Sequence, residues 1–205
     1  MLTVSQLKSL LRTEGLGLTK RLGQHHLIDQ RLIAQLIARW ALGPKDTVVE
    51  IGSGLGALTE PMAERAGCVI AVEVDRRICA LLRERMSRLP RVAVVCEDIL
   101  QFRWETLESP VVVVGAIPYS ITSPVLVMLC EHRRAIREAF LIVQHEVAQR
   151  MAAAPGTKAY GRLSVLVQYG WEVRQMMPVP RSAFFPQPTV DSACVHLITR
   201  AQPVV

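Results

Sequence analysis

The sequence has no run of apolar residues long enough to cross a membrane. Its most apolar stretch, Val111 to Cys130, is interrupted by Gly115, Pro118, Tyr119 and Pro124, whereas a membrane helix needs about 20 mostly apolar residues. No secretory signal is visible at the start, and there is neither an internal repeat nor a low-complexity segment. Because half of the 205 residues are apolar, we expect a folded chain of about one domain.

Paired cysteines and metal-ligand spacings are also missing. We interpret the single, scattered cysteines as reduced, mostly buried thiols of a cytoplasmic protein; they are Cys68, Cys79, Cys96, Cys130 and Cys194. The pair His25-His26 has no third ligand near it in sequence. His145 is followed four residues later by Gln149, not by the second histidine of a metalloprotease motif. We therefore predict no metal site.

Acidic residues are fewer than basic ones, which leaves a net charge of +6 and favours an anionic partner. Several arginines follow one another in the region 76–91, where a solvated helix face is the commoner explanation. Other basic residues are candidates for phosphate contacts. Among these, we expect Arg133, Arg134 and Arg137 to lie closer to the catalytic side if the strands take the order of the family that the chain resembles. Arg150, Lys158 and Arg162 are further candidates.

Strand-like and helix-like segments alternate along the chain. Strands are predicted at 47–51, 68–74, 92–96, 111–114 and 139–143, and helices from 29, at 58–66, 76–88 and 145–153, and after Ser123-Pro124. Residues 163–169 and 194–198 are later apolar stretches. The strands are apolar on both faces, which is typical of a mostly parallel sheet covered by helices on both sides. Ligands of such sheets bind beyond the carboxyl ends of the strands.

The residues that follow the first two strands suit a nucleoside. Gly52, Gly54 and Gly56 form a turn that lets a ligand approach the backbone closely. Their spacing differs from the dinucleotide pattern, and a simple tight turn is the alternative. Glu73 lies 21 residues after Gly52, where an acid can take both hydroxyls of a ribose. The alternative for Glu73 is a solvated acid at a strand end.

The third and fourth strand ends complete this pattern. The Asp98 carboxylate can accept from an adenine amine and the Ile99 backbone can contact a ring nitrogen, although a helix or turn cap is an alternative role for Asp98. Pro118 makes a rigid turn and Tyr119 offers a flat face for a base, although an ordinary turn in a core loop is the alternative. Together these positions predict a site for an adenosine-containing ligand, specifically S-adenosylmethionine.

The chain resembles the small-subunit rRNA adenine dimethyltransferases, relatives of the erythromycin-resistance methylases. The resemblance covers residues 19 to 198 and is carried by several segments: Lys20–Gln30, Glu50–Thr59, Glu73–Asp75, Glu97–Ile99, Ile117–Pro124, Gln144–Val147, Lys158–Val165 and Ser182–Ala193. The last two segments are distinctive of this family rather than of methyltransferases in general.

The resemblance implies a class I S-adenosylmethionine-dependent methyltransferase with a Rossmann-like, mostly parallel seven-stranded sheet and helices on both faces. It implies methylation of adenine exocyclic amines near the 3′ end of small-subunit rRNA, with that rRNA or the ribosomal subunit as partner. The cofactor contacts carry over to His25, Leu27, Gly52, Gly54, Glu73, Val74, Asp98, Ile99 and Ala116. The contacts to the target adenine carry over to Ala116, Pro118, Tyr119 and Phe184. We expect a cytoplasmic monomer.

The chain departs from the family pattern in three places. Ala116 replaces an asparagine whose side-chain oxygen accepts from the target amine; losing such a contact typically costs roughly 100- to 1000-fold in rate. His25-His26 replaces Asn-Phe. The expected organisation is an N-terminal arm at 1–22 and a catalytic domain at 23–200, without the family's helical C-terminal domain, so that RNA affinity is lower.

Two other functions stay open at this point. One is an inactive relative that binds cofactor or RNA, and the other is a methyltransferase for a different, small-molecule acceptor. Multiple-turnover methylation of RNA by the purified protein would exclude the first. Absence of any labelled non-RNA product would count against the second.

Overall fold

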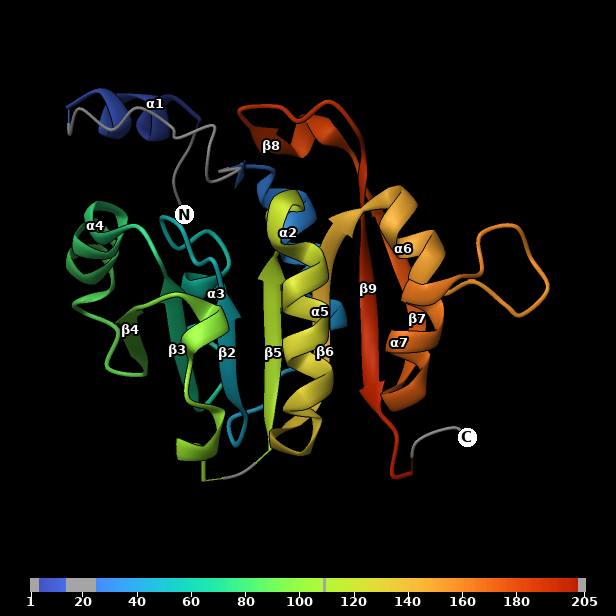
Figure 1. Ribbon diagram of the computed structural model, residues 1–205. Helices are drawn as coiled ribbons and strands as arrows, with labels where there is room; N and C mark the ends of the chain where they lie inside the picture. Colours follow the sequence, from blue (N-terminus) through green and yellow to red (C-terminus); the bar gives the residue numbers. More distant parts are fainter. Residues whose placement is uncertain (1–3, 14–24, 109, 203–205) are drawn as a thin grey trace.

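The computed structural model describes residues 4–13, 25–108 and 110–202 (Figure 1). Its helices are α1 (Val4–Thr13), α2 (Gln30–Arg39), α3 (Thr59–Ala63), α4 (Arg76–Met86), α5 (Thr122–Glu131), α6 (His145–Met151) and α7 (Arg162–Gly170). Its strands are β1 (His26–Leu27), β2 (Thr47–Ile51), β3 (Cys68–Glu73), β4 (Val92–Cys96), β5 (Val111–Ala116), β6 (Ile136–Gln144), β7 (Trp171–Val179), β8 (Phe184–Phe185) and β9 (Ser192–Thr199).

Seven strands form one sheet in the order β4-β3-β2-β5-β6-β9-β7. The five strands from β4 to β6 in this order are parallel to one another, whereas β9 is antiparallel to both β6 and β7. The order reverses direction between β2 and β5, where the carboxyl ends of neighbouring strands open a crevice. The expected mostly parallel seven-stranded sheet is therefore confirmed.

Alternate side chains of the buried strands pack on opposite faces of the sheet. Val49 and Val113 face α5, α6 and α7, which lie in front of the sheet in Figure 1. Val48 and Val112 face α2 and α3 on the other side. The two hydrophobic layers explain why these strands carry apolar residues on both faces, as buried parallel strands do.

Aspartate side chains cap the first turns of α2 and α4. Asp29 accepts from the backbone N–H groups of Arg31 and Leu32 at the start of α2, and Asp75 accepts from that of Arg77 at the start of α4. Such caps satisfy N–H groups that lack a partner within the helix. The predicted start of the helix at Asp29 is confirmed.

Several elements differ from the sequence-based expectations. Helix α3 covers only Thr59–Ala63 of the predicted 58–66. The apolar stretch 163–169 belongs to helix α7, and β7 was not expected because its half-buried, Pro-containing sequence shows no clean alternation. The two-residue strands β1 and β8 pair with each other across a separation of more than 150 residues, which no local pattern indicates.

The expected N-terminal arm is described only in part. Residues 4–13 form α1, in which Leu7 is buried and packs with Leu55 and Ile78. Residues 14–22 of the arm and residues 20–24 of the first family segment lie outside the described residues. The boundary between arm and catalytic domain stays a prediction.

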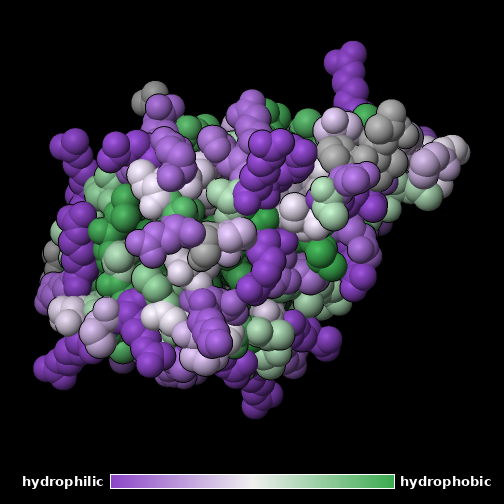
Figure 2. Space-filling model, turned by 90° about the horizontal axis from the view of Figure 1, so that it is seen from below, coloured by the Kyte–Doolittle hydropathy of each residue, from purple (hydrophilic) through white to green (hydrophobic). Residues whose placement is uncertain are grey.

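The structure contradicts two further expectations. Only Cys79 and Cys194 are buried, and the other three cysteines are half-buried, so the thiols are not mostly buried. Arg133, Arg134 and Arg137 lie at the start of β6, at the opposite end of the sheet from the crevice, because α5 runs from the crevice to the other end before β6 begins. Arg137 pairs there with Asp46 and Glu138. In Figure 2 this face is mainly hydrophilic.

Candidate cofactor and acceptor site

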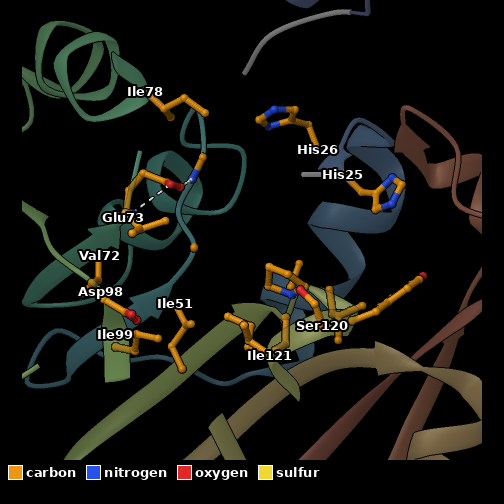
Figure 3. A pocket seen from close by; sticks show the side chains of 18 of the residues that line it. His25, His26, Ile51, Val72, Glu73, Ile78, Asp98, Ile99, Ser120 and Ile121 are labelled. Carbon is orange, nitrogen blue, oxygen red and sulfur yellow. Dashed lines mark hydrogen bonds between the residues drawn. The ribbon is translucent and has the colours of Figure 1, made fainter. Parts of the chain in front are cut away.

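A cavity of about 240 Å³ opens at the carboxyl ends of β2, β3, β4 and β5 (Figure 3). Of the predicted site residues, it is lined by His25, Gly52, Gly54, Glu73, Val74, Asp98, Ile99, Ala116, Pro118, Tyr119 and Phe184. Leu27 is the exception, since it lines a smaller cavity of about 60 Å³ beside the first. This side cavity shares His25, Gly52, Gly54 and Ala116 with the main cavity. The fold therefore brings the predicted residues together at one end of the sheet.

The turn after β2 requires glycine for conformational reasons. Gly52, Gly54 and Gly56 have φ values of +67°, +53° and +85°, a region that side chains disfavour. A Cβ on Gly56 would also lie 2.8 Å from Cε of Met86. Gly52 and Gly54 line the cavity as well. The turn is thus tight and, at the same time, open to a ligand.

Glu73 ends β3 and its carboxylate is held by three backbone N–H groups. Its Oε1 accepts from Val74 and Asp75 at 3.0 Å, and its Oε2 accepts from Gly54 at 2.9 Å. The side chain is 7% exposed, and burial raises its pKa. A carboxylate has about four acceptor positions, so one on Oε2 remains for a ligand hydroxyl. Glu73 is therefore not a solvated acid at a strand end.

Asp98 has the capping role that the sequence offered as an alternative, and it also lines the cavity. Its Oδ1 accepts from the N–H of Leu100 at the start of a short 3₁₀ turn, Ile99–Gln101. The next side chain, Ile99, is buried in the cavity wall. In Figure 3 Asp98 and Ile99 lie on the same side as Glu73. A flat base can rest between Ile99 and the other apolar side chains of this wall.

The segment after β5 forms the opposite wall. The Pro118 carbonyl accepts from the N–H of Ile121 and the hydroxyl of Thr122, and the Ile117 N–H donates to the Ile142 carbonyl. These bonds fix the turn on β6. Ala116 is half-buried and lines both cavities, so a methyl group is the whole side chain at the position of the family's asparagine.

Tyr119 is held in place by residues from distant parts of the chain. Its hydroxyl is 3.1 Å from the Ser192 hydroxyl, and its ring centroid is 5.9 Å from that of His25. His25 Nδ1 in turn lies 2.7 Å from the Pro186 carbonyl oxygen. These contacts join the residue before β1, the residue after β8, the β5 turn and β9 around the ring.

We expect the Tyr119–Ser192 hydrogen bond to be measurable as a coupling energy. Tyr119→Phe and Ser192→Ala each remove one hydroxyl, and their effects on the free energy of unfolding should be non-additive by about 0.5–1.5 kcal/mol. Chemical denaturation of the two single variants and the double variant measures this. Tyr119→Phe combined with the remote Ser87→Ala is the control and should be additive.

The sequence reasoning missed several residues of the wall. They are mainly the apolar residues Ile51, Val72, Ile78, Ile121 and Ile142, together with His26 and Ser192. Four of these residues could have been predicted from their positions in the chain. Ile51, Val72 and Ile142 lie at or near strand ends, and Ile78 lies at the start of α4. Ser192 lies in the family segment Ser182–Ala193, but no local pattern assigned it to the site, because it reaches the cavity only through the pairing of β9 with β6.

Glu50 is buried behind the glycine turn at 2% exposure, and its Oε2 accepts from the Thr59 hydroxyl. Burial raises its pKa to about 8. Because the pKa is higher in the folded than in the unfolded chain, this group contributes stability at low pH that is lost as the pH rises from about 4.5 to about 8. The expected slope is about −1.4 kcal/mol per pH unit.

Urea denaturation at pH 5, 6, 7 and 8 tests this dependence. Glu50→Gln keeps an acceptor for Thr59 without a titratable group, so the loss of stability with rising pH should be smaller in that variant. The exposed Glu64→Gln is the matched control and should follow the unmodified chain. Equal slopes in all three proteins would contradict the shifted pKa of Glu50.

The residues present fit an S-adenosyl compound. One cavity contains the features that such a ligand needs. It has a buried carboxylate with one free acceptor position and apolar walls for a base. Its glycines have positive φ values, so that the ligand can approach the backbone closely. In addition, the buried Nε2 of His26 has no hydrogen-bond partner among the described residues. Within the described residues, no group of three or more His, Cys, Asp or Glu is placed to hold a metal ion, and no helix is long and apolar enough to span a membrane.

The sheet order and the position of the cavity define a class I methyltransferase, and solved structures of this class are similar to the chain. The 23S rRNA methyltransferase ErmE has a TM-score of 0.78 and 35% identity, over 87% of this chain and 71% of that one. A dimethyladenosine transferase from Plasmodium falciparum has a TM-score of 0.76 and 31% identity, over 83% and 62%.

The chain belongs to the ribosomal RNA adenine dimethylase family, whose family model matches residues 16–205. Ribosomal RNA small subunit methyltransferase A of Bacillus cytotoxicus is 39% identical over 210 residues, which cover 99% of this chain and 72% of the relative. The protein of the same name from Bacillus cereus strain B4264 is 40% identical over the same shares. The resemblance inferred from the motifs is therefore confirmed.

Proposed function

We propose that this protein transfers methyl groups from S-adenosylmethionine to the exocyclic amine of adenine in small-subunit rRNA. The observation that carries the proposal is a single cavity with the Glu73 carboxylate on one wall and the Pro118-Tyr119 turn on the other. A nucleoside cofactor and a flat acceptor base can occupy the two walls at once. Membership of the family supports rRNA adenine as the acceptor.

Each wall has its own role in this proposal. Glu73 accepts a ribose hydroxyl through the free position of Oε2, and Asp98 with Ile99 holds the adenine of the cofactor. Tyr119 and Phe184 hold the target base, which must be unstacked from its RNA to enter. Phe184 lines the cavity and is 6% exposed. Gly52, Gly54 and Val74 complete the cofactor wall, whereas Leu27 acts from the side cavity.

The chemistry is a direct transfer that needs no covalent intermediate on the protein. A bound S-adenosyl cofactor would supply a methyl group on a sulfonium. The amine nitrogen would form the new C–N bond as the C–S bond breaks, the electron pair of the broken bond would stay on sulfur, and the methylated amine would release one proton to water. The protein orients the amine lone pair toward that carbon, chiefly by positioning. The Pro118 carbonyl is already engaged by Ile121 and Thr122, so the Ile117 carbonyl is the backbone acceptor left for the amine.

Transfer of labelled methyl to unmethylated small ribosomal subunits tests the function. We expect label in small-subunit rRNA and little in large subunits or in an RNA-free extract. Label confined to the large subunit would instead support a second candidate, methylation of 23S rRNA, which the likeness to ErmE favours. Binding of the cofactor without transfer to any RNA would refute the enzymatic function and leave a binding protein.

We further propose that the protein acts as a monomer in the cytoplasm, with residues 23–200 as its catalytic domain. The buried apolar residues of the described part pack around one sheet. Sedimentation at several concentrations tests the oligomeric state, and a mass that doubles over the range would contradict a monomer.

A further inference from the structure

His26 occupies the place where the main cavity and the side cavity meet. It begins strand β1, which pairs with β8, and it lines both cavities. Its ring lies against the glycine turn, because a Cβ on Gly54 would be 3.1 Å from Nδ1 and 3.3 Å from Cε1. In Figure 3 the ring points toward the wall that carries Ile78 and Glu73, whereas the ring of His25 turns away from it.

The Nε2 of His26 is buried and has no hydrogen-bond partner in the described part of the chain. Two other histidines of the fold do have partners: His25 lies against the Pro186 carbonyl and His196 against Glu138. Burial and the neighbouring His25 lower the pKa of His26 to about 4, so the ring is neutral at pH 7 and carries one donor and one acceptor. A buried nitrogen without a partner is costly, and a bound ligand can supply the missing hydrogen bond.

The position of His26 indicates which part of the ligand it meets. Glu73 and Asp98 lie on the wall assigned to the ribose and the adenine. Beyond Gly54 the side cavity holds the polar side chains of Gln30, Glu50 and Arg85, which suit the charged amino-acid end of an S-adenosyl compound better than a base. A neutral imidazole at the junction can donate to a carboxylate or accept from an ammonium group.

We propose that Nε2 of His26 hydrogen-bonds the amino-acid end of the bound S-adenosyl compound and so contributes to its affinity. This inference rests on the proposed function, because it takes the ligand to be that cofactor or its product. It assigns a binding role to the residue that stands where the family pattern has an apolar phenylalanine.

Calorimetric titration of the full chain with S-adenosylhomocysteine and with adenosine tests the proposal. His26→Phe fills the same space without a hydrogen-bonding nitrogen and should weaken S-adenosylhomocysteine binding about 5- to 10-fold. His26→Gln keeps a side-chain donor and acceptor and should bind within about threefold of the unmodified chain. Adenosine lacks the amino-acid end, so its affinity should be the same in all variants. The exposed His145→Phe, outside both cavities, is the matched control.

The possible results separate the inference from the proposed function. If the unmodified chain binds S-adenosylhomocysteine and His26→Phe binds it equally or more tightly, the role of His26 is refuted while the function stands. An equal loss for S-adenosylhomocysteine and adenosine in His26→Phe would also refute it, since that result indicates disturbed packing. If the unmodified chain binds neither compound, the proposed function fails and the role of His26 fails with it. Thermal unfolding of each variant establishes that it is folded.

Discussion

Ala116→Asn is expected to raise the rate of methyl transfer by about 100-fold or more. Ala116 ends β5 at the point where the two cavities meet, and its side chain has no acceptor. An asparagine oxygen there would add a fixed acceptor for the target amine beside the Ile117 carbonyl and would stabilise charge as it develops on nitrogen. Loss of one such fixed polar contact typically costs 100- to 1000-fold in rate, so its introduction should recover a similar factor.

Single-turnover transfer of labelled methyl to unmethylated small subunits measures this effect. Ala116→Leu is the matched control, because leucine has nearly the shape of asparagine but no hydrogen-bonding group. Because Ala116 lines both cavities, the affinity of each variant for S-adenosylhomocysteine is measured as well, so that an effect on cofactor binding is separated from an effect on the acceptor. If Ala116→Asn is no faster than Ala116→Leu, the side-chain acceptor is dispensable and positioning by Pro118 and Tyr119 carries the rate.

Glu73→Gln is expected to weaken binding of S-adenosylhomocysteine by about 10- to 100-fold. The change removes the charge that strengthens a hydrogen bond to a ribose hydroxyl, an interaction of about 1.5–3 kcal/mol. It also leaves one side-chain oxygen where Glu73 has two. With that oxygen kept toward Val74 and Asp75, the new NH₂ group faces the Gly54 N–H, which now donates to Oε2.

Calorimetric titration measures the change in affinity, and thermal unfolding reports whether the turn after β3 is preserved. The exposed Glu84→Gln on α4 removes the same charge away from the cavity and should bind normally. Adenosine should lose affinity in parallel with S-adenosylhomocysteine, because both carry the ribose. Affinities within twofold of the unmodified chain for both compounds would contradict a ribose-binding role for Glu73.

Much of the site could be predicted because parallel strands place their carboxyl ends at one edge. Gly52, Glu73, Asp98 and Pro118 each lie at the end of, or just after, a strand that the sequence indicates through its apolar residues. A parallel sheet then brings these residues together without any knowledge of longer-range contacts. The seven-stranded order could be anticipated only from the family resemblance, since alternation of strands and helices does not specify which strands are neighbours.

The sequence by itself determined the class of fold, the apolar layers on both faces of the sheet and the cofactor wall, because these depend on local periodicity and on residues next to strand ends. Only the tertiary structure decided what closes the site. Phe184 and Ser192 reach the cavity through the pairing of β8 with β1 and of β9 with β6, and Leu27 faces the side cavity. Arg133 and Arg137 lie at the far end of the sheet, because α5 runs there from the crevice before β6 begins. Such pairings depend on contacts between segments far apart in the chain, and these leave no periodic signal in either segment.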